Sequence, residues 1–235
     1  MKTSPTLILL FSTLALTAGL SAQTFEGKIR LKTTGMAKSS RHSGGDAPMF
    51  MTYSIKGGLM RVDMETGEGK MMGCSIIDPV KREMTMLMPD QKMYMTMKLP
   101  EPKPSTASGA PQSDVDFVRT GETEMIVGYK CEKIIVKSKN GDTEVWGAEG
   151  LGTFKSIGAG GPMGRPAPKS AWEAALAEHG FFPLRMVSRD KYGNVQMSME
   201  AVSVDKQSLP DSAFTAPADF QKFEMPAIPG FGGGS

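Results

Sequence analysis

Residues 82–99 read Arg82-Glu83-Met84-Thr85-Met86-Leu87-Met88-Pro89-Asp90-Gln91-Lys92-Met93-Tyr94-Met95-Thr96-Met97-Lys98-Leu99. Methionine occupies every second position on both sides of the central Pro-Asp-Gln-Lys segment. Successive side chains of a β-strand point to opposite faces, so each run of three methionines shares one face. Pro89 presets a turn backbone, and Asp90 is suited to bond back to the main chain. The sequence therefore predicts a β-hairpin with one thioether face, on which Met84, Met86 and Met88 lie opposite Met93, Met95 and Met97.

Alternation of apolar and polar residues continues on both sides of this hairpin. It begins at Phe25, and glycine-containing turns at Gly57-Gly58 and Asn140-Gly141 separate further strands. Near the C-terminus Met197 and Met199 lie on one face of a strand whose pattern changes near Ala201, which predicts a β-bulge or a change of covering layer there. These patterns predict about ten or eleven strands.

One segment is typical of a helix. In residues 170–179, Ser170 is suited to cap the N-terminus, Glu173 follows three residues later, and Gly180 provides a stop. Trp172 and Leu176 form its apolar stripe. A single short helix cannot cover ten strands, so the sheet must curl. The predicted fold class is mainly β (α+β): a curved antiparallel sheet or half-barrel with one clear helix as a lid.

The chain begins with Lys2, an apolar run and small residues that end at Ala22, which is typical of a secretory signal peptide. We therefore expect a soluble periplasmic or secreted protein, with cleavage near Ala22 and no transmembrane segment thereafter. The expected organisation is a signal peptide at 1–22, a single half-barrel domain at 23–224 with loops at 33–48, 100–116 and 149–169, and a disordered tail at 225–235.

Composition excludes several classes of function. The formal net charge is +2 over 235 residues, so nothing steers the protein toward nucleic acid. The two histidines, His42 and His179, have no neighbouring ligand cluster, so we expect no His-based zinc site and no cofactor. No nucleophile motif or phosphate-binding loop is present, and we expect that the protein is not an enzyme.

Two cysteines, Cys74 and Cys131, leave two possibilities open. In an exported chain they could form one disulfide, which would stabilise the fold by at most roughly 4 kcal/mol. They could equally be two separate buried thiols, because spacing alone does not place them within bridging distance.

The methionine face has three possible interpretations. Thioether side chains fill irregular cores, and they also line surfaces that accept varied apolar ligands. They are soft ligands as well, so an exported protein with Met-x-Met repeats is a candidate for Cu(I) binding. As a lining for an apolar ligand the candidate residues are Met84, Met86, Met88, Met93, Met95, Met97, Met197, Met199 and Trp172.

Five segments together resemble a family of exported bacterial proteins called domain of unknown function 4412. They are Tyr53-Ser54-Ile55-Lys56-Gly57, Met60-Arg61-Val62-Asp63-Met64, Met86-Leu87-Met88-Pro89-Asp90-Gln91-Lys92-Met93-Tyr94, Gly128-Tyr129-Lys130-Cys131-Glu132-Lys133 and Gly180-Phe181-Phe182-Pro183-Leu184. The likeness covers nearly the whole chain after the signal peptide.

The resemblance implies a fold similar to that of the LolA-like lipoprotein-localisation carriers, in which a curved sheet and a helical lid hold acyl chains. It implies no established activity, and no functional residue of the carriers matches a position here. Our leading hypothesis is a protein that binds a lipid or another apolar molecule on the concave face, with an envelope protein as a possible partner. The alternatives are a structural or protein-interaction module with a filled core, and Cu(I) binding.

Overall fold

We analysed a computed structural model of the chain. It describes residues 25–35, 47–99, 115–152 and 154, the single positions 173, 176 and 179, and residues 180–224. The predicted signal peptide and C-terminal tail lie outside the described residues. Within the described residues, no helix has the length and apolar character needed to cross a membrane.

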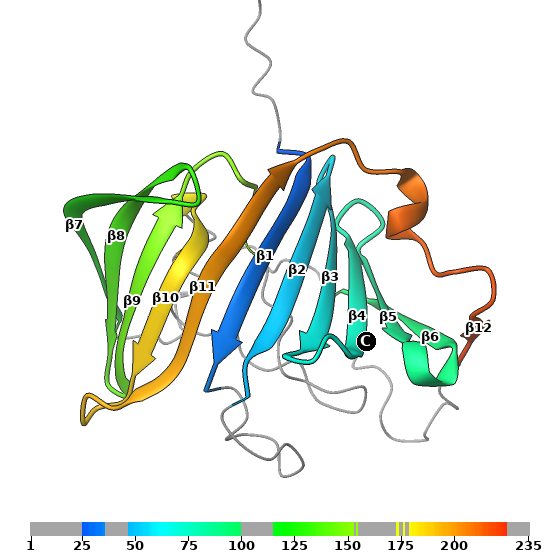
Figure 1. Cartoon of the computed structure of the whole chain (residues 1–235), viewed down its shortest axis with the longest axis horizontal. Coiled ribbons are helices and arrows are strands. Elements are labelled where there is room, and N and C mark those ends of the chain that lie inside the picture. Colours follow the sequence, from blue (N-terminus) through cyan, green and yellow to red (C-terminus); the bar gives the residue numbers. More distant parts are fainter. Residues whose placement is uncertain are drawn as a thin grey trace, which may run out of the picture.

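All regular strands belong to one sheet, whose order is β12-β6-β5-β4-β3-β2-β1-β11-β10-β9-β8-β7. The sheet is open, because its two end strands do not pair with each other (Figure 1). Pairing is antiparallel throughout, except between β12 and β6. The strands are β1 (Gly27–Thr34), β2 (Met49–Lys56), β3 (Leu59–Thr66), β4 (Met71–Asp78), β5 (Glu83–Met88), β6 (Met93–Lys98), β7 (Val115–Ile126), β8 (Tyr129–Ser138), β9 (Gly141–Ala148), β10 (Phe182–Arg189), β11 (Val195–Lys206) and β12 (Gln221–Lys222).

The mainly β architecture is confirmed, with three differences in detail. The sheet has twelve strands rather than ten or eleven, because the two-residue β12 adds to its edge. β1 continues to Thr34, and β7 begins at Val115, so the predicted loops at 33–48 and 100–116 are each two residues too long at one end. These residues extend strands whose neighbours supply partners, and tertiary pairing overrides their loop-like composition.

The predicted helical lid is not supported as an element, because most of residues 170–179 lie outside the described residues. Three positions of this segment are described, and Glu173, Leu176 and His179 each have helical backbone conformation. Trp172 is outside the described residues. No complete α-helix occurs in the described part of the chain.

Local turn chemistry sets the strand register. Gly57 and Gly58 have φ values of 55° and 86°, a left-handed conformation that glycine adopts without strain, and they close the β2–β3 hairpin. A short 3₁₀ turn, η2 (Pro89–Gln91), followed by Lys92 at φ 50°, closes β5–β6. In the β1–β11 pairing Arg30 and Leu31 face Ser203 and Ala201, so Val202 is bulged and the bulge predicted near Ala201 is confirmed.

The sheet has apolar side chains on both faces. We call the face that carries Met86 the inner face and the opposite one the outer face. A large core cluster includes Ile29, Val62 and Met186 from the inner face. A smaller cluster on the outer face joins Cys74, Ile76 and Leu87 to Leu209 and Phe214 from the C-terminal segment.

The C-terminal segment, residues 207–223, forms a strap over the outer face of β3–β6 (Figure 1). It contains a second 3₁₀ turn, η3 (Asp211–Phe214), and ends in β12 beside β6. Lys56 Nζ donates to the carbonyl of Leu209 at 2.5 Å and pairs with Asp211 at 2.8 Å. The strap therefore covers apolar strand residues that would otherwise be exposed.

Candidate functional site

The methionine hairpin has the predicted register. Met84 pairs with Met97, Met86 with Met95, and Met88 with Met93. Directly paired residues of antiparallel strands project from the same face, so the six thioethers form one surface. This part of the prediction is confirmed. Whether the surface holds a ligand stays a prediction.

The thioether surface extends well beyond the hairpin. Met51 pairs with Met64, and Met186 pairs with Met199, so methionines also oppose each other on neighbouring strands. Successive pairings through Ser75, Val62, Tyr53 and the strands beyond place all of them on the inner face. Most of the chain's 20 methionines lie on this face: Met49, Met51, Met60, Met64, Met84, Met86, Met88, Met93, Met95, Met97, Met186, Met197 and Met199.

The hairpin methionines are only partly withdrawn from solvent. Met95 is buried, whereas the other five are half-buried. By contrast, Met186 and Met199 belong to the buried core. The inner face thus divides into a packed region that spans β1–β3 and β8–β11, and a more accessible thioether region, made by β5 and β6, which we call the methionine wall.

One polar group lies beside the methionine wall without a partner. Ser75 pairs with Val62 on one side and with Met86 on the other, and its side chain is 1% exposed. Its Oγ makes no hydrogen bond. A buried hydroxyl left in this state costs about 1–3 kcal/mol, so its presence requires a physical reason. A ligand group that accepts a hydrogen bond from the Ser75 hydroxyl would supply such a reason.

Aromatic rings fill the neighbouring part of the inner face. Phe182 is fully buried and lies edge-on to both Tyr53 and Phe154, with ring centroids 5.5 Å apart in each pair. Leu176 is buried in the same cluster. The His179 ring stacks on Phe117 with centroids 4.3 Å apart. The described positions of the predicted helix therefore pack against this face, as a cover would.

The pKa of Tyr53 also places Glu173, from the predicted helical segment, near the inner face. Burial raises the pKa of the Tyr53 phenol well above its usual value, and the carboxylate of Glu173 raises it further. Glu173 thus lies close enough to the inner face for its charge to act on Tyr53. The phenol stays neutral over the whole physiological pH range.

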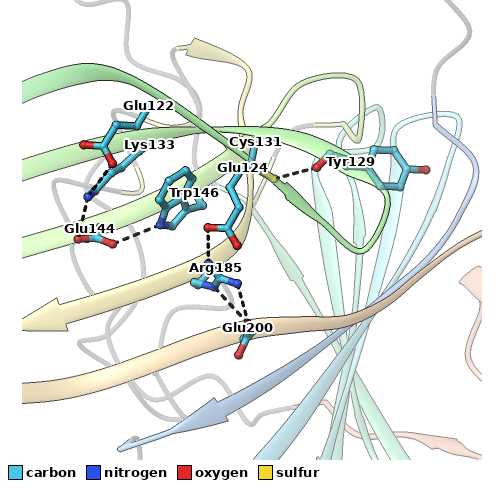
Figure 2. A network of polar contacts seen from close by, with 9 residues as sticks. All are labelled: Glu122, Glu124, Tyr129, Cys131, Lys133, Glu144, Trp146, Arg185 and Glu200. Carbon is cyan, nitrogen blue, oxygen red and sulfur yellow. Dashed lines mark hydrogen bonds and ion pairs between the residues drawn. The ribbon is translucent and has the colours of Figure 1, made fainter.

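A polar network lies on the outer face of β7–β11, at the end of the sheet away from the methionine wall (Figure 2). Arg185 pairs with Glu124 at 2.8 Å and with Glu200 at 3.0 Å, so it links β7, β10 and β11. Lys133 pairs with Glu122 and Glu144, and the Trp146 indole donates to Glu144 at 3.2 Å. Figure 2 shows these charges directed at each other. The network is structural, and Trp146 acts as a packing anchor.

A shallow hollow of about 300 Å³ also opens on the outer face. Its charges are internally compensated, because Arg30 pairs with Glu65 at 2.9 Å and Arg61 with Asp63 at 2.8 Å. It offers neither an apolar lining nor a net charge that would select a ligand. The hollow is lined by Lys28, Arg30, Thr52, Arg61, Asp63, Glu65, Met71, Ser203 and Asp205.

Of the two possibilities that the sequence left open for the cysteines, the structure has two separate buried thiols. Cys74 and Cys131 are both buried and both free. They belong to β4 and β8, and six strands stand between these two in the sheet. Each thiol packs in a different apolar cluster, so no small movement could bring the sulfur atoms together.

Both thiols should be unreactive in the native protein. Burial raises the pKa of Cys131 to about 11 and raises that of Cys74 further, so neither forms the reactive thiolate near pH 8. We expect a disulfide-exchange reagent to find no thiol in the native state and two in guanidinium chloride, monitored by absorbance. Finding none after denaturation, in the absence of reductant, would show that the disulfide forms after all.

Sequence reasoning missed the strap and the role of Ser75. The strap's signal was present, because β4 carries apolar residues at Cys74, Ile76 and Ile77, and a strand with two apolar faces needs a cover on each. No sequence signal marked Ser75, whose isolation depends on its neighbours across the sheet. Within the described residues no group of three or more His, Cys, Asp or Glu side chains is placed to hold a metal ion.

Comparison with protein families gives one match. The family described as domain of unknown function (DUF4412) matches residues 25–220, which span the sheet and most of the strap. A search of curated proteins finds no match.

Comparison with solved structures gives distant similarities. An uncharacterized conserved protein from Thermus thermophilus is 13% identical, with 84% of this chain and 90% of that chain covered and a TM-score of 0.46. MucB, in the Pseudomonas aeruginosa MucA/MucB complex, is 9% identical, with 85% and 58% covered and a TM-score of 0.43. A domain from Vibrio parahaemolyticus, described as a putative outer membrane lipoprotein-sorting protein domain, is 10% identical, with 80% and 89% covered and a TM-score of 0.29. The likeness concerns the fold alone and carries no argument about activity or partners.

Proposed function

This chain belongs to the family described as domain of unknown function (DUF4412), and we propose that it is an exported protein that binds a lipid or another apolar molecule against the methionine wall. Binding, rather than catalysis, is the proposed role. A periplasmic or secreted location is part of the proposal, and its basis is the signal-like sequence of residues 1–22.

The observation that carries this proposal is the half-buried state of the hairpin methionines. Five of the six keep part of their surface accessible, although they lie on the same sheet face as a closed core. Unbranched thioether side chains adapt their rotamers to ligands of varied shape, which is why they recur on surfaces that bind diverse apolar partners. An acyl chain laid against the wall would complete its burial.

Ser75 supports a ligand that is apolar but carries one polar group. Apolar sites commonly hold a few polar groups that fix the orientation of the ligand. The Ser75 hydroxyl is unpartnered and neighbours Met86 across the β4–β5 pairing. A carbonyl oxygen of an acyl ester or fatty acid could accept a hydrogen bond from the Ser75 hydroxyl, once the flexible Met86 side chain moves aside.

Titration with a fluorescent fatty acid tests the proposal. A Met86→Gln/Met88→Gln variant keeps side-chain length but makes the wall polar. We expect it to bind at least about tenfold more weakly, because about 1.4 kcal/mol of apolar contact is lost. The matched Met86→Leu/Met88→Leu variant keeps an apolar wall and should retain affinity. Mass spectrometry of protein purified from its native envelope should show a co-purified apolar molecule.

The competing function is a structural or protein-interaction module with a filled core. The aromatic cluster of Tyr53, Phe154 and Phe182 favours it for one part of the inner face. If the protein leaves the envelope without a ligand and takes up no fatty acid, this alternative replaces lipid binding. Equal affinity of the Gln and Leu variants would likewise remove the methionine wall as the site.

A further inference from the structure

We infer that the methionine wall contains a site for a soft monovalent metal ion, Cu(I), centred on Met86 and Met95. This site does not depend on acyl binding, because it uses the sulfur atoms of the wall rather than its apolar surface. Met86 and Met95 pair directly, and Met84–Met97 and Met88–Met93 pair on either side of them. Two neighbouring pairs make a set of four adjacent thioethers, and the central pair, Met86–Met95, belongs to both such sets.

The spacing of these residues suits convergence on one ion. Paired Cα atoms in an antiparallel ladder lie about 5 Å apart, and residues two positions apart on one strand lie roughly 7 Å apart. Four methionines at the corners of such a rectangle project from the same face. Each has a long, unbranched side chain with freely adjustable rotamers, so three or four sulfur atoms can turn toward a common centre.

The chemistry of the wall selects the charge and softness of the ion. Every inner-face position of the hairpin strands is methionine, whereas Glu83, Lys98 and the threonines lie on the outer face. Glu83 and Lys98 pair with each other at 2.7 Å, so neither charge is directed at the wall. Neutral thioethers prefer Cu(I) over harder ions, and a single charge costs less to desolvate than the two of Zn²⁺ or Mg²⁺.

Partial exposure makes the site accessible. Met84, Met86, Met88, Met93 and Met97 are half-buried, so an ion can reach their sulfur atoms without unfolding of the sheet. Methionines of the packed core, such as Met186 and Met199, pair as well but are withdrawn from solvent. Met51 and Met64 also pair and are half-buried, but among the described strands only the hairpin sets three methionine pairs side by side, with half-buried methionines on both sides of the buried Met95.

Anaerobic titration with Cu(I) against a competing chromogenic chelator tests this inference. We expect the wild-type chain to withdraw one Cu(I) per molecule, and X-ray absorption to show sulfur ligands. Met86→Leu/Met95→Leu should weaken binding by about a hundredfold or more, since loss of outer-shell groups alone costs ten- to a hundredfold. A matched control, Met60→Leu/Met197→Leu, changes two methionines of the same face that pair with no other methionine, and should leave affinity unchanged.

A second measurement avoids any variant. In the wild-type protein with ¹³C-labelled methionine methyl groups, Ag(I), a soft analogue of Cu(I), should shift the signals of Met86 and Met95 and leave those of Met60 and Met197 in place. The inference is overturned if the chelator keeps all the Cu(I), if the Leu double variant binds as the wild type does, or if these methyl signals do not move. Fatty-acid uptake by the Leu variant reports separately on the proposed lipid function.

Discussion

Phe182→Ala should lower the free energy of unfolding by about 3–5 kcal/mol, the range for removing a fully buried phenylalanine. Phe182 is 0% exposed and contacts two other rings edge-on, Tyr53 and Phe154. Such aromatic pairs contribute beyond the area they bury. The loss is large against the roughly 5–15 kcal/mol that stabilises a typical domain.

Equilibrium unfolding in urea measures this loss, and Phe50→Ala is the matched control. The Phe50 ring is half-buried on the outer face, and the Arg30 guanidinium lies over it at 4.5 Å from its centroid. Its removal opens no enclosed cavity, so we expect a markedly smaller effect. Comparable losses in the two variants would mean that the aromatic cluster is not the rigid part of the inner face.

The contrast with the methionine wall explains why the two regions can have different roles. Met86→Leu conserves side-chain volume and should cost less than about 1.5 kcal/mol. A rigid aromatic region and a tolerant thioether region therefore share one face. Stability depends on the first, and adaptable binding would use the second.

Residue alternation and turn residues in the sequence predicted those features of the sheet that depend only on neighbouring residues. Alternation and turn residues were enough for the Met86–Met95 register, the Gly57-Gly58 turn and the bulge near Ala201, because each depends on a few neighbouring residues. The mainly β architecture followed from counting strands against the one expected helix. The methionine face of the candidate site was predicted for the same reason.

Features set by distant partners could not be predicted in this way. The separation of Cys74 from Cys131 depends on strand order, in which β1 pairs with β11 and thereby joins the two halves of the chain. The unpartnered state of Ser75 depends on Val62 and Met86, which come from other strands. The Pro-rich composition of the C-terminal segment hid Leu209 and Phe214, which are buried only because the outer face of β4 needs a cover.

The strap over β4 is the source of the second large effect that we expect on stability. Phe214→Ala should lower the free energy of unfolding by about 3 kcal/mol, near the lower end for phenylalanine because the site lies close to the surface. Phe223→Ala, at the exposed end of the strap, should change it by less than about 0.5 kcal/mol. Cys74 lies beneath the strap, so its thiol should become reactive in Phe214→Ala while Cys131 stays protected.

Acid should loosen the same strap. Hydrogen bonding to Lys56 lowers the pKa of Asp211, and hydrogen bonding to Lys92 lowers that of Asp219. A carboxylate whose pKa is lower in the folded state stabilises that state at pH values above the pKa that it has in the unfolded chain, which is about 4. This stabilisation is lost as the pH falls through the pKa of the folded state. Reaction of Cys74 with an acid-tolerant thiol reagent should therefore accelerate below about pH 4, and Asp211→Asn/Asp219→Asn should already react faster at neutral pH. If the double variant and the wild type remain equally protected at every pH, apolar packing alone holds the strap and its ion pairs contribute nothing measurable.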